Sequence, residues 1–141
     1  YHAVIAHSVG AGCSVLATSR GLKVQKLVLI AGPSRYELVV RFFLSNLKLS
    51  QRSQNYFITT LADRVKLPVS EMNVGVIGNT TSTPVLIIHD EQDREVSIKA
   101  AEEIKINWPT AELLITTGLG HRRVLRDPKV IASTVKFIAK T

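Results

Sequence analysis

The chain has 141 residues, of which 45% are hydrophobic and 21% are charged, and its formal net charge is +7 at pH 7. This length suits one domain, and the composition is that of a globular protein rather than a disordered or fibrous one. The basic residues form no dense tract, no nucleic-acid motif accompanies them, and no apolar run reaches the roughly 20 residues of a membrane span. We therefore expect neither a nucleic-acid partner nor a membrane partner.

Short apolar runs alternate with helical patterns along most of the chain. In order, we expect strands at residues 3–6, 26–32, 83–90 and 111–117, and helices at residues 8–19, 97–107 and 127–139. Gly21 is placed to end the first helix, Ser97 can cap the second, and Asp127 followed by Pro128 begins the last. Strands that alternate with helices predict an α/β fold with a parallel sheet of about four strands flanked by helices.

Residues 35–78 interrupt this alternation. The segments YELVVRFFLSNLKL and QNYFITTLADRV both carry apolar residues at helical spacing, and no strand pattern separates them. Pro68, Gly75 and Gly78 mark the joints of the later part. The sequence thus predicts a single domain over residues 1–141 with a helical insertion at about residues 35–78.

The stretch AHSVG, residues 6–10, ends the first strand at a serine between small residues. A tight strand-to-helix turn needs small residues beside it, because the backbone folds close to itself, and such a turn would expose the Ser8 hydroxyl above the carboxyl ends of the strands. The main-chain N–H of Val9, at the helix start, would then point to where an oxyanion can form. A serine that only caps a helix explains these five residues equally well.

A serine nucleophile needs a base, and the base needs an acid that orients it. The segment HDEQDREV after the third strand supplies Asp90 and Asp93, and GLGHRR after the fourth supplies His121. The carboxyl ends of parallel strands lie along one edge of a sheet, so we expect these loops to converge with Ser8 on one crevice. The histidines and acids do not have the spacing of a zinc site, and we expect no metal and no cofactor.

With these motifs the sequence resembles the α/β-hydrolase fold superfamily, matched along essentially the whole chain to the carboxyl-terminal half of such an enzyme, from the nucleophile elbow to the final helix. The resemblance implies that Ser8 is the nucleophile, His121 the base and Asp93 the acid of a catalytic triad, and that Asp90 shapes the acid loop. It implies a serine hydrolase of the ester or thioester type with a small acyl-containing substrate. The same scaffold also carries peroxidases and carbon–carbon bond hydrolases.

The resemblance also implies that helices of the insertion form a cap over the pocket. Its aromatic residues are candidates either for lining that pocket or for packing the cap onto the body; they are Phe42, Phe43, Tyr56 and Phe57. An upstream half of the fold, with a loop that gives a second oxyanion donor, does not occur in this sequence, so we expect the active site to be incomplete here.

The first strand would then present an unpaired edge, which invites pairing. We expect it to associate with the missing upstream half or with a second copy of the chain. The alternative to a hydrolase is a truncated, catalytically silent domain that acts as a self-associating or interaction module. A single cysteine, Cys13, excludes an internal disulfide and fits a reducing, cytoplasmic location, and we expect its side chain to be buried.

The remaining residues near these motifs have simpler interpretations. We expect His7 and His89 to be structural, since the first points away from the nucleophile and the second lies within a strand end. Arg122 and Arg123 are expected to be a solvated pair rather than contacts to an acidic substrate group.

Overall fold

A computed structural model describes residues 1–140. The chain forms two compact units, one made of residues 1–34 with the residues from 74 on, and one made of residues 35–73. The larger unit contains the sheet and its flanking helices, and the smaller unit is helical.

The larger unit alternates strands and helices, with four strands at the four predicted places. Its elements are β1 (Ala3–His7), α1 (Val9–Ser19), β2 (Lys26–Ile30), α4 (Val74–Gly78), β3 (Val85–Asp90), α5 (Lys99–Asn107), β4 (Glu112–Thr116), α6 (Gly120–Arg123), a 3-10 turn η2 (Val124–Arg126) and α7 (Pro128–Ala139). The strands form one parallel sheet in the order β1-β2-β3-β4, so that β1 and β4 are its edges. The prediction of an α/β fold with a parallel sheet of four strands is confirmed.

The two central strands are buried on both faces, as expected for a sheet covered on both sides. One face packs against α7 and η2 through a core cluster; its buried residues are Val28, Ile30, Ala31, Leu86, Ile88, Val124, Val130 and Phe137. Successive strand residues point to opposite faces, so Leu27, Leu29 and Ile87 face the other layer. In that layer α1 contacts α4, and α4 contacts α5.

Glycines allow the close packing of α4 against α5. A Cβ on Gly75 would lie 2.8 Å from Cβ of Asn107, and a Cβ on Gly78 would lie 2.1 Å from Cε3 of Trp108. The side chain of Trp108 is completely buried. The glycines that the sequence suggests as joints of the insertion therefore lie within a helix of the larger unit.

The helix ends agree with the sequence in part. Gly21 has φ 100°, the left-handed conformation expected after α1. Asp127 accepts hydrogen bonds from the N–H groups of Lys129 and Val130 at the start of α7, as predicted. Helix α5 begins at Lys99, later than expected, and Ile98 rather than Ser97 occupies the N-cap position. The Ser97 hydroxyl accepts only a long hydrogen bond of 3.4 Å from the N–H of Lys99.

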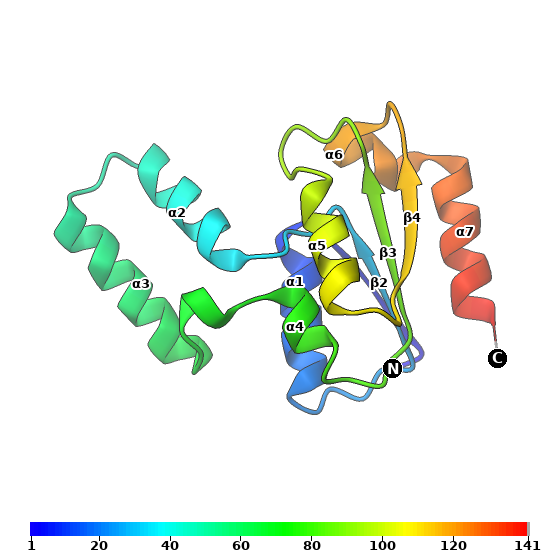
Figure 1. The fold of residues 1–141 in the computed structure, drawn as a ribbon, viewed down its shortest axis with the longest axis horizontal. Coiled ribbons are helices and arrows are strands. Elements are labelled where there is room, and N and C mark those ends of the chain that lie inside the picture. Colours follow the sequence, from blue (N-terminus) through cyan, green and yellow to red (C-terminus); the bar gives the residue numbers. More distant parts are fainter. Residues whose placement is uncertain (141) are drawn as a thin grey trace. The chain divides into compact units, whose positions relative to one another are not determined.

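The strands place their carboxyl ends together. The arrowheads of β2, β3 and β4 point the same way, and α6 lies at that end of the sheet (Figure 1). The turn after β1 and the loops after β3 and β4 therefore all open at this edge.

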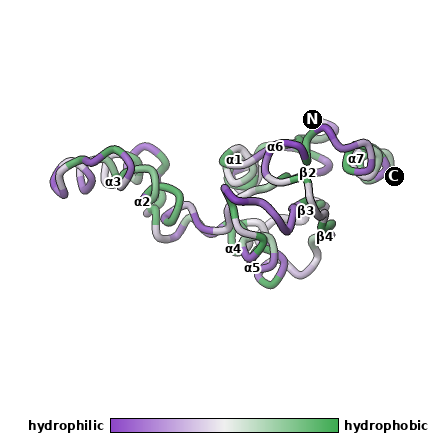
Figure 2. Tube along the Cα trace, turned by 90° about the horizontal axis from the view of Figure 1, so that it is seen from above, coloured by the Kyte–Doolittle hydropathy of each residue, from purple (hydrophilic) through white to green (hydrophobic). Residues whose placement is uncertain are grey.

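The smaller unit contains α2 (Tyr36–Asn46), α3 (Gln51–Val65) and a 3-10 turn η1 (Val69–Glu71). Its own small core consists of Val40, Leu44, Val69 and Met72 with partly buried residues of α3 around them. Both helices also carry outward-facing apolar side chains, and Figure 2 shows the mixture of hydrophobic and hydrophilic residues along them. Among residues 1–140, no helix is long and apolar enough to cross a membrane.

Candidate active site

Ser8 occupies a strained turn between β1 and α1. Its φ of 54° and ψ of −127° lie outside the regions that residues with a Cβ normally adopt. The turn is fixed on both sides, because the Ser8 N–H donates to the carbonyl oxygen of Ile30 at 2.9 Å and the Ser8 carbonyl accepts from the N–H of Ala11 at 3.0 Å. Its hydroxyl makes no capping hydrogen bond to α1, so the interpretation of Ser8 as a simple helix cap is wrong.

The glycine that is closely packed near this turn is Gly32, whereas the sequence suggested Gly10. A Cβ on Gly10 would lie 4.0 Å from Cβ of Ala6, which is an ordinary contact. A Cβ on Gly32, directly after β2, would lie only 2.6 Å from Cβ of Ala11. The close approach between α1 and the chain after β2 therefore requires Gly32, whereas Gly10 has room for a methyl group.

The side chains of Ser8, His121 and Asp93 lie in a continuous row. His121 Nε2 is 3.1 Å from Ser8 Oγ, and His121 Nδ1 is 2.7 Å from Asp93 Oδ2. The other carboxylate oxygen of Asp93 accepts the N–H groups of Glu95 at 2.8 Å and Val96 at 2.9 Å. His121 and Asp93 are each only 8% exposed, and Ser8 is half-buried. An ionised carboxylate at Nδ1 requires a proton there, which leaves Nε2 of the neutral ring free to accept the Ser8 proton.

Val9 is the first residue of α1, directly after Ser8. The N–H groups of a first helical turn point out of the helix end, toward the carboxyl edge of the sheet in this chain. The main-chain N–H of Val9 therefore lies at the helix start, where the sequence suggests an oxyanion donor.

Asp90 is buried below the two loops that carry Asp93 and His121. Burial raises the pKa of its carboxyl group, but four hydrogen bonds outweigh burial and hold the pKa below its ordinary value. The donors are the main-chain N–H groups of Gly120, Leu119 and Gln92 and the hydroxyl of Thr116. Asp90 thus connects the acid loop with the base loop, as the resemblance implies for a loop-shaping residue.

Two further histidines contact the row. His7 Nε2 donates to the main-chain oxygen of His121 at 2.9 Å, and the ring centroids of the two histidines are 4.7 Å apart. His89 is completely buried, and its Nε2 is 2.9 Å from the carbonyl oxygen of Val96 and 3.5 Å from Asp93 Oδ2. The expectation that His7 points away from the site is wrong, because its ring contacts that of His121. Both histidines hold main-chain oxygens of the loops that carry the row.

Glu95 is a contact that the sequence did not indicate. One carboxylate oxygen lies 3.8 Å from His121 Nε2, and the other accepts from Nε of Arg122 at 3.1 Å. Arg123 donates to the carbonyl oxygens of Leu119 and Gly118 within its own loop. The arginines are exposed, as predicted, but each has a partner. The D-x-E spacing beside a triad acid could have pointed to Glu95.

Cys13 is exposed on the outer side of α1, so the prediction of a buried thiol is wrong. Within residues 1–140, no group of three or more histidine, cysteine, aspartate or glutamate side chains could hold a metal ion.

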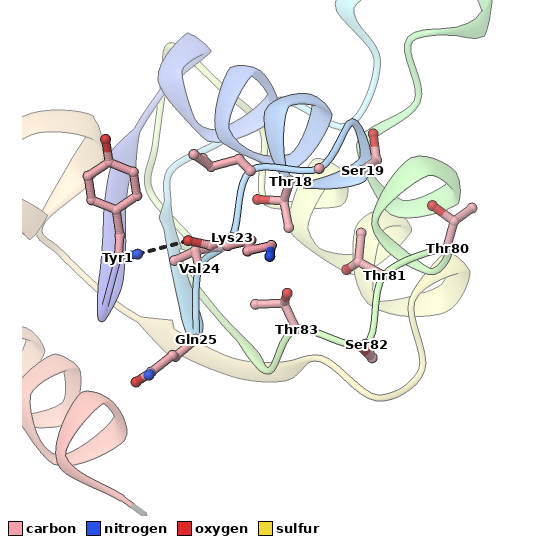
Figure 3. Close-up of a pocket in the computed structure, with 12 residues that line it drawn as sticks. Tyr1, Thr18, Ser19, Lys23, Val24, Gln25, Thr80, Thr81, Ser82 and Thr83 are labelled. Carbon is pink, nitrogen blue, oxygen red and sulfur yellow. Dashed lines mark hydrogen bonds between the residues drawn. The ribbon is translucent and has the colours of Figure 1, made fainter.

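A cavity of about 580 Å³ lies at the opposite end of the sheet, before β2 and β3 (Figure 3). Hydroxyl groups line much of it, and several of them donate to nearby helix carbonyls; Thr18 donates to Ser14, Ser19 to Leu16, Thr80 to Ile77 and Thr81 to Gly78. This cavity is remote from Ser8, because it opens at the amino ends of the parallel strands.

Comparison with solved structures identifies the architecture. The Pyrococcus furiosus esterase Pf2001 matches with a TM-score of 0.65 at 23% identity, over 96% of this chain and 51% of the esterase. An α/β hydrolase from the metagenome of Mar Chica lagoon sediments matches with a TM-score of 0.62 at 22% identity, over 96% and 59% of the two chains. BpoC of Mycobacterium tuberculosis, described as a non-heme bromoperoxidase, matches with a TM-score of 0.66 at 14% identity, over 97% and 66%.

The chain spans between 51% and 66% of the length of these structures. No protein-family model and no curated protein sequence matches it. At such low identities the likeness concerns the fold. The chain therefore has the α/β-hydrolase fold over the part of these structures that it spans.

Proposed function

We propose that the chain carries the catalytic triad of a serine hydrolase that acts on esters or thioesters. The row Ser8–His121–Asp93 is the observation that supports this, since its two short contacts join a hydroxyl, an imidazole and a buried carboxylate in the order that nucleophilic acyl transfer requires. The strained conformation of Ser8 adds to it, because strain of this kind concentrates at functional sites.

In the acylation step, Ser8 Oγ forms a bond to the acyl carbonyl carbon while its proton moves to His121 Nε2. The carbonyl π electrons move to oxygen, and the N–H of Val9 donates one hydrogen bond to that oxyanion. Asp93 stabilises the imidazolium through Nδ1. As the oxyanion reforms the carbonyl, the bond to the leaving oxygen or sulphur breaks, and the imidazolium gives that atom its proton.

In the second step, a water molecule loses a proton to His121 Nε2 as it attacks the acyl-Ser8 carbonyl. Collapse of the new tetrahedral intermediate releases the carboxylic acid and returns the proton to Ser8 Oγ. A second oxyanion donor is expected from elsewhere in the parent fold, and loss of one such donor typically lowers the rate by about 10²–10³.

The test is labelling with a fluorophosphonate, which reacts with serines that a base activates. We expect one adduct by intact mass, mapped to Ser8, no adduct in Ser8→Ala, and only slow residual labelling in His121→Ala. Ser19→Ala is the matched control, since this exposed serine of α1 donates to the Leu16 carbonyl and lies away from the row. A folded chain that forms no adduct at Ser8 would contradict the proposal.

The second candidate is an interaction module that associates through β1. One observation favours it: β1 is an edge of the sheet and its Ile5 side chain is 57% exposed. We propose that this edge pairs with a further strand, from an upstream half of the fold or from a second copy. Light scattering tests the second copy, and Ile5→Lys should shift a dimer toward monomer; a monomer at all concentrations contradicts pairing between copies.

A further inference from the structure

Two carboxylates are buried among residues 1–140, and the mechanism above uses only one of them. Asp93 contacts the ring of His121. Asp90 ends β3, is completely buried, and touches neither His121 nor Ser8 through any of its four hydrogen bonds. A buried carboxylate is costly unless it is fully satisfied, so these four partners indicate what Asp90 does.

Two of the four donors directly precede the base. The N–H of Leu119 donates to Asp90 Oδ2 at 3.0 Å, and the N–H of Gly120 donates to Asp90 Oδ1 at 2.9 Å. The loop here has Gly118 and Gly120 in left-handed conformations, with φ of 86° and 66°. Such a loop has many alternative backbone states, because glycine restricts it little. The contacts with Asp90 therefore select the conformation from which His121 projects.

The other two donors anchor Asp90 itself. The N–H of Gln92, in the acid loop, donates to Oδ1 at 3.0 Å, and the hydroxyl of Thr116, at the end of β4, donates to Oδ2 at 2.8 Å. Each carboxylate oxygen thus accepts one donor from the base loop and one from elsewhere. The carboxylate fixes the base loop relative to the acid loop and to the end of β4.

We propose that Asp90 is a positioning residue for His121: it holds the main chain that carries the base, while Asp93 holds the ring. This inference rests on the proposed function. Displacement of a catalytic group by about 1 Å can lower a rate by about 10²-fold, so a loop held by two hydrogen bonds matters to the chemistry.

The test is the second-order rate of fluorophosphonate labelling at Ser8 in the 141-residue chain and in Asp90→Asn. Asparagine keeps the shape but replaces one acceptor oxygen by an N–H₂ group, so one amide of the base loop faces a donor. We expect labelling to be about 10- to 100-fold slower with an unchanged far-UV circular dichroism spectrum. Thr116→Val removes only the anchor from β4 and should slow labelling about two- to fivefold.

Asp127→Ala is the matched control for a loss of stability. Asp127 also accepts two main-chain N–H groups, at 2.9 and 3.0 Å, but they belong to α7 rather than to the base loop. This variant should be less stable and should label at the rate of the unchanged chain. A positioning role therefore predicts slower labelling in Asp90→Asn but not in Asp127→Ala, whereas a merely structural role predicts that both folded variants label alike.

A second readout uses the His121→Ala background, in which no base remains to be positioned. There Asp90→Asn should lower the residual labelling rate by less than twofold. If Asp90 acts through His121, the effects of the two substitutions are not additive, so removal of His121 also removes the effect of Asp90. Equal labelling of Asp90→Asn and the unchanged chain overturns the inference, as does a full multiplicative loss in the His121→Ala background. If Asp90→Asn does not fold, an unchanged rate in Thr116→Val overturns it. No labelling of the unchanged chain contradicts the proposed function as well.

Discussion

Exchange of Ser8 for glycine should stabilise the fold relative to exchange for alanine, although both changes remove the hydroxyl group. Ser8 has φ 54° and ψ −127°, whereas residues with a Cβ at positive φ normally keep ψ near the left-handed helical value. A conformation of this kind costs of order 1–3 kcal/mol when a Cβ is present. Glycine adopts it readily but loses about 0.5–1 kcal/mol more conformational entropy on folding. The expected difference is about 0.5–2 kcal/mol in favour of Ser8→Gly.

Urea unfolding followed by circular dichroism measures this difference. The melting temperature of Ser8→Gly should exceed that of Ser8→Ala by about 2–4 °C for each kcal/mol of the difference. Both variants lose the contact between Ser8 and His121 Nε2, so that loss cancels in the comparison. Ala17→Gly in the last turn of α1 is the control at an unstrained position, where glycine should lower the free energy of unfolding by about 0.5–1 kcal/mol. A Ser8→Gly variant no more stable than Ser8→Ala would refute the argument from strain.

Three other predictions concern the surroundings of this turn. The pKa of Asp90 is lowered in the folded chain, so its stabilising contribution is complete above the ordinary pKa of about 3.9 and is lost as the pH falls through the folded value; acid unfolding should therefore be less steep in Asp90→Asn. Gly32→Ala should cost about 1–3 kcal/mol of unfolding free energy through overpacking, whereas Gly10→Ala should be tolerated, as thermal unfolding of the pair would reveal. His7→Leu removes the donor to the His121 carbonyl and should slow labelling of the serine several-fold, and His7→Gln, which can donate, should restore part of the rate; equal rates in both variants would contradict this.

The strands and the chain order of the site could be predicted from the sequence because they depend on local patterns. The buried residues of β2 and the first four residues of β3 are all apolar, which is typical of strands covered on both faces. Ser8, Asp93 and His121 each follow a strand, and parallel strands bring such positions to one edge. The parallel topology alone brings these three loops to one edge of the sheet, so their proximity could be predicted from the sequence.

The supporting contacts could not be predicted, because they join residues far apart in the chain. Asp90 and Gly120 are separated by 30 residues, and His7 and His121 by 114. Whether a carboxylate at the end of a strand meets a main-chain N–H depends on the conformation of two loops. Apolar periodicity predicts strands and helices but not the conformation of loops. The exposure of Cys13 escaped prediction for a related reason: small residues line α1 on more than one side, so their pattern does not identify the buried face.

The features of this edge bear on the choice between a hydrolase and a silent module. Ser8 is strained, Asp90 and Asp93 are buried carboxylates, and the Nδ1 atom of His89 is buried with no hydrogen-bond partner in the described part of the chain. Strain and an unpaired buried nitrogen oppose stability, a buried carboxylate is costly unless all of its hydrogen bonds are made, and apolar replacements of similar volume are often neutral or stabilising for buried charges. A module that only pairs through β1 needs none of them. Departures from stable local structure are expected where a site requires them, and their concentration around His121 favours the hydrolase.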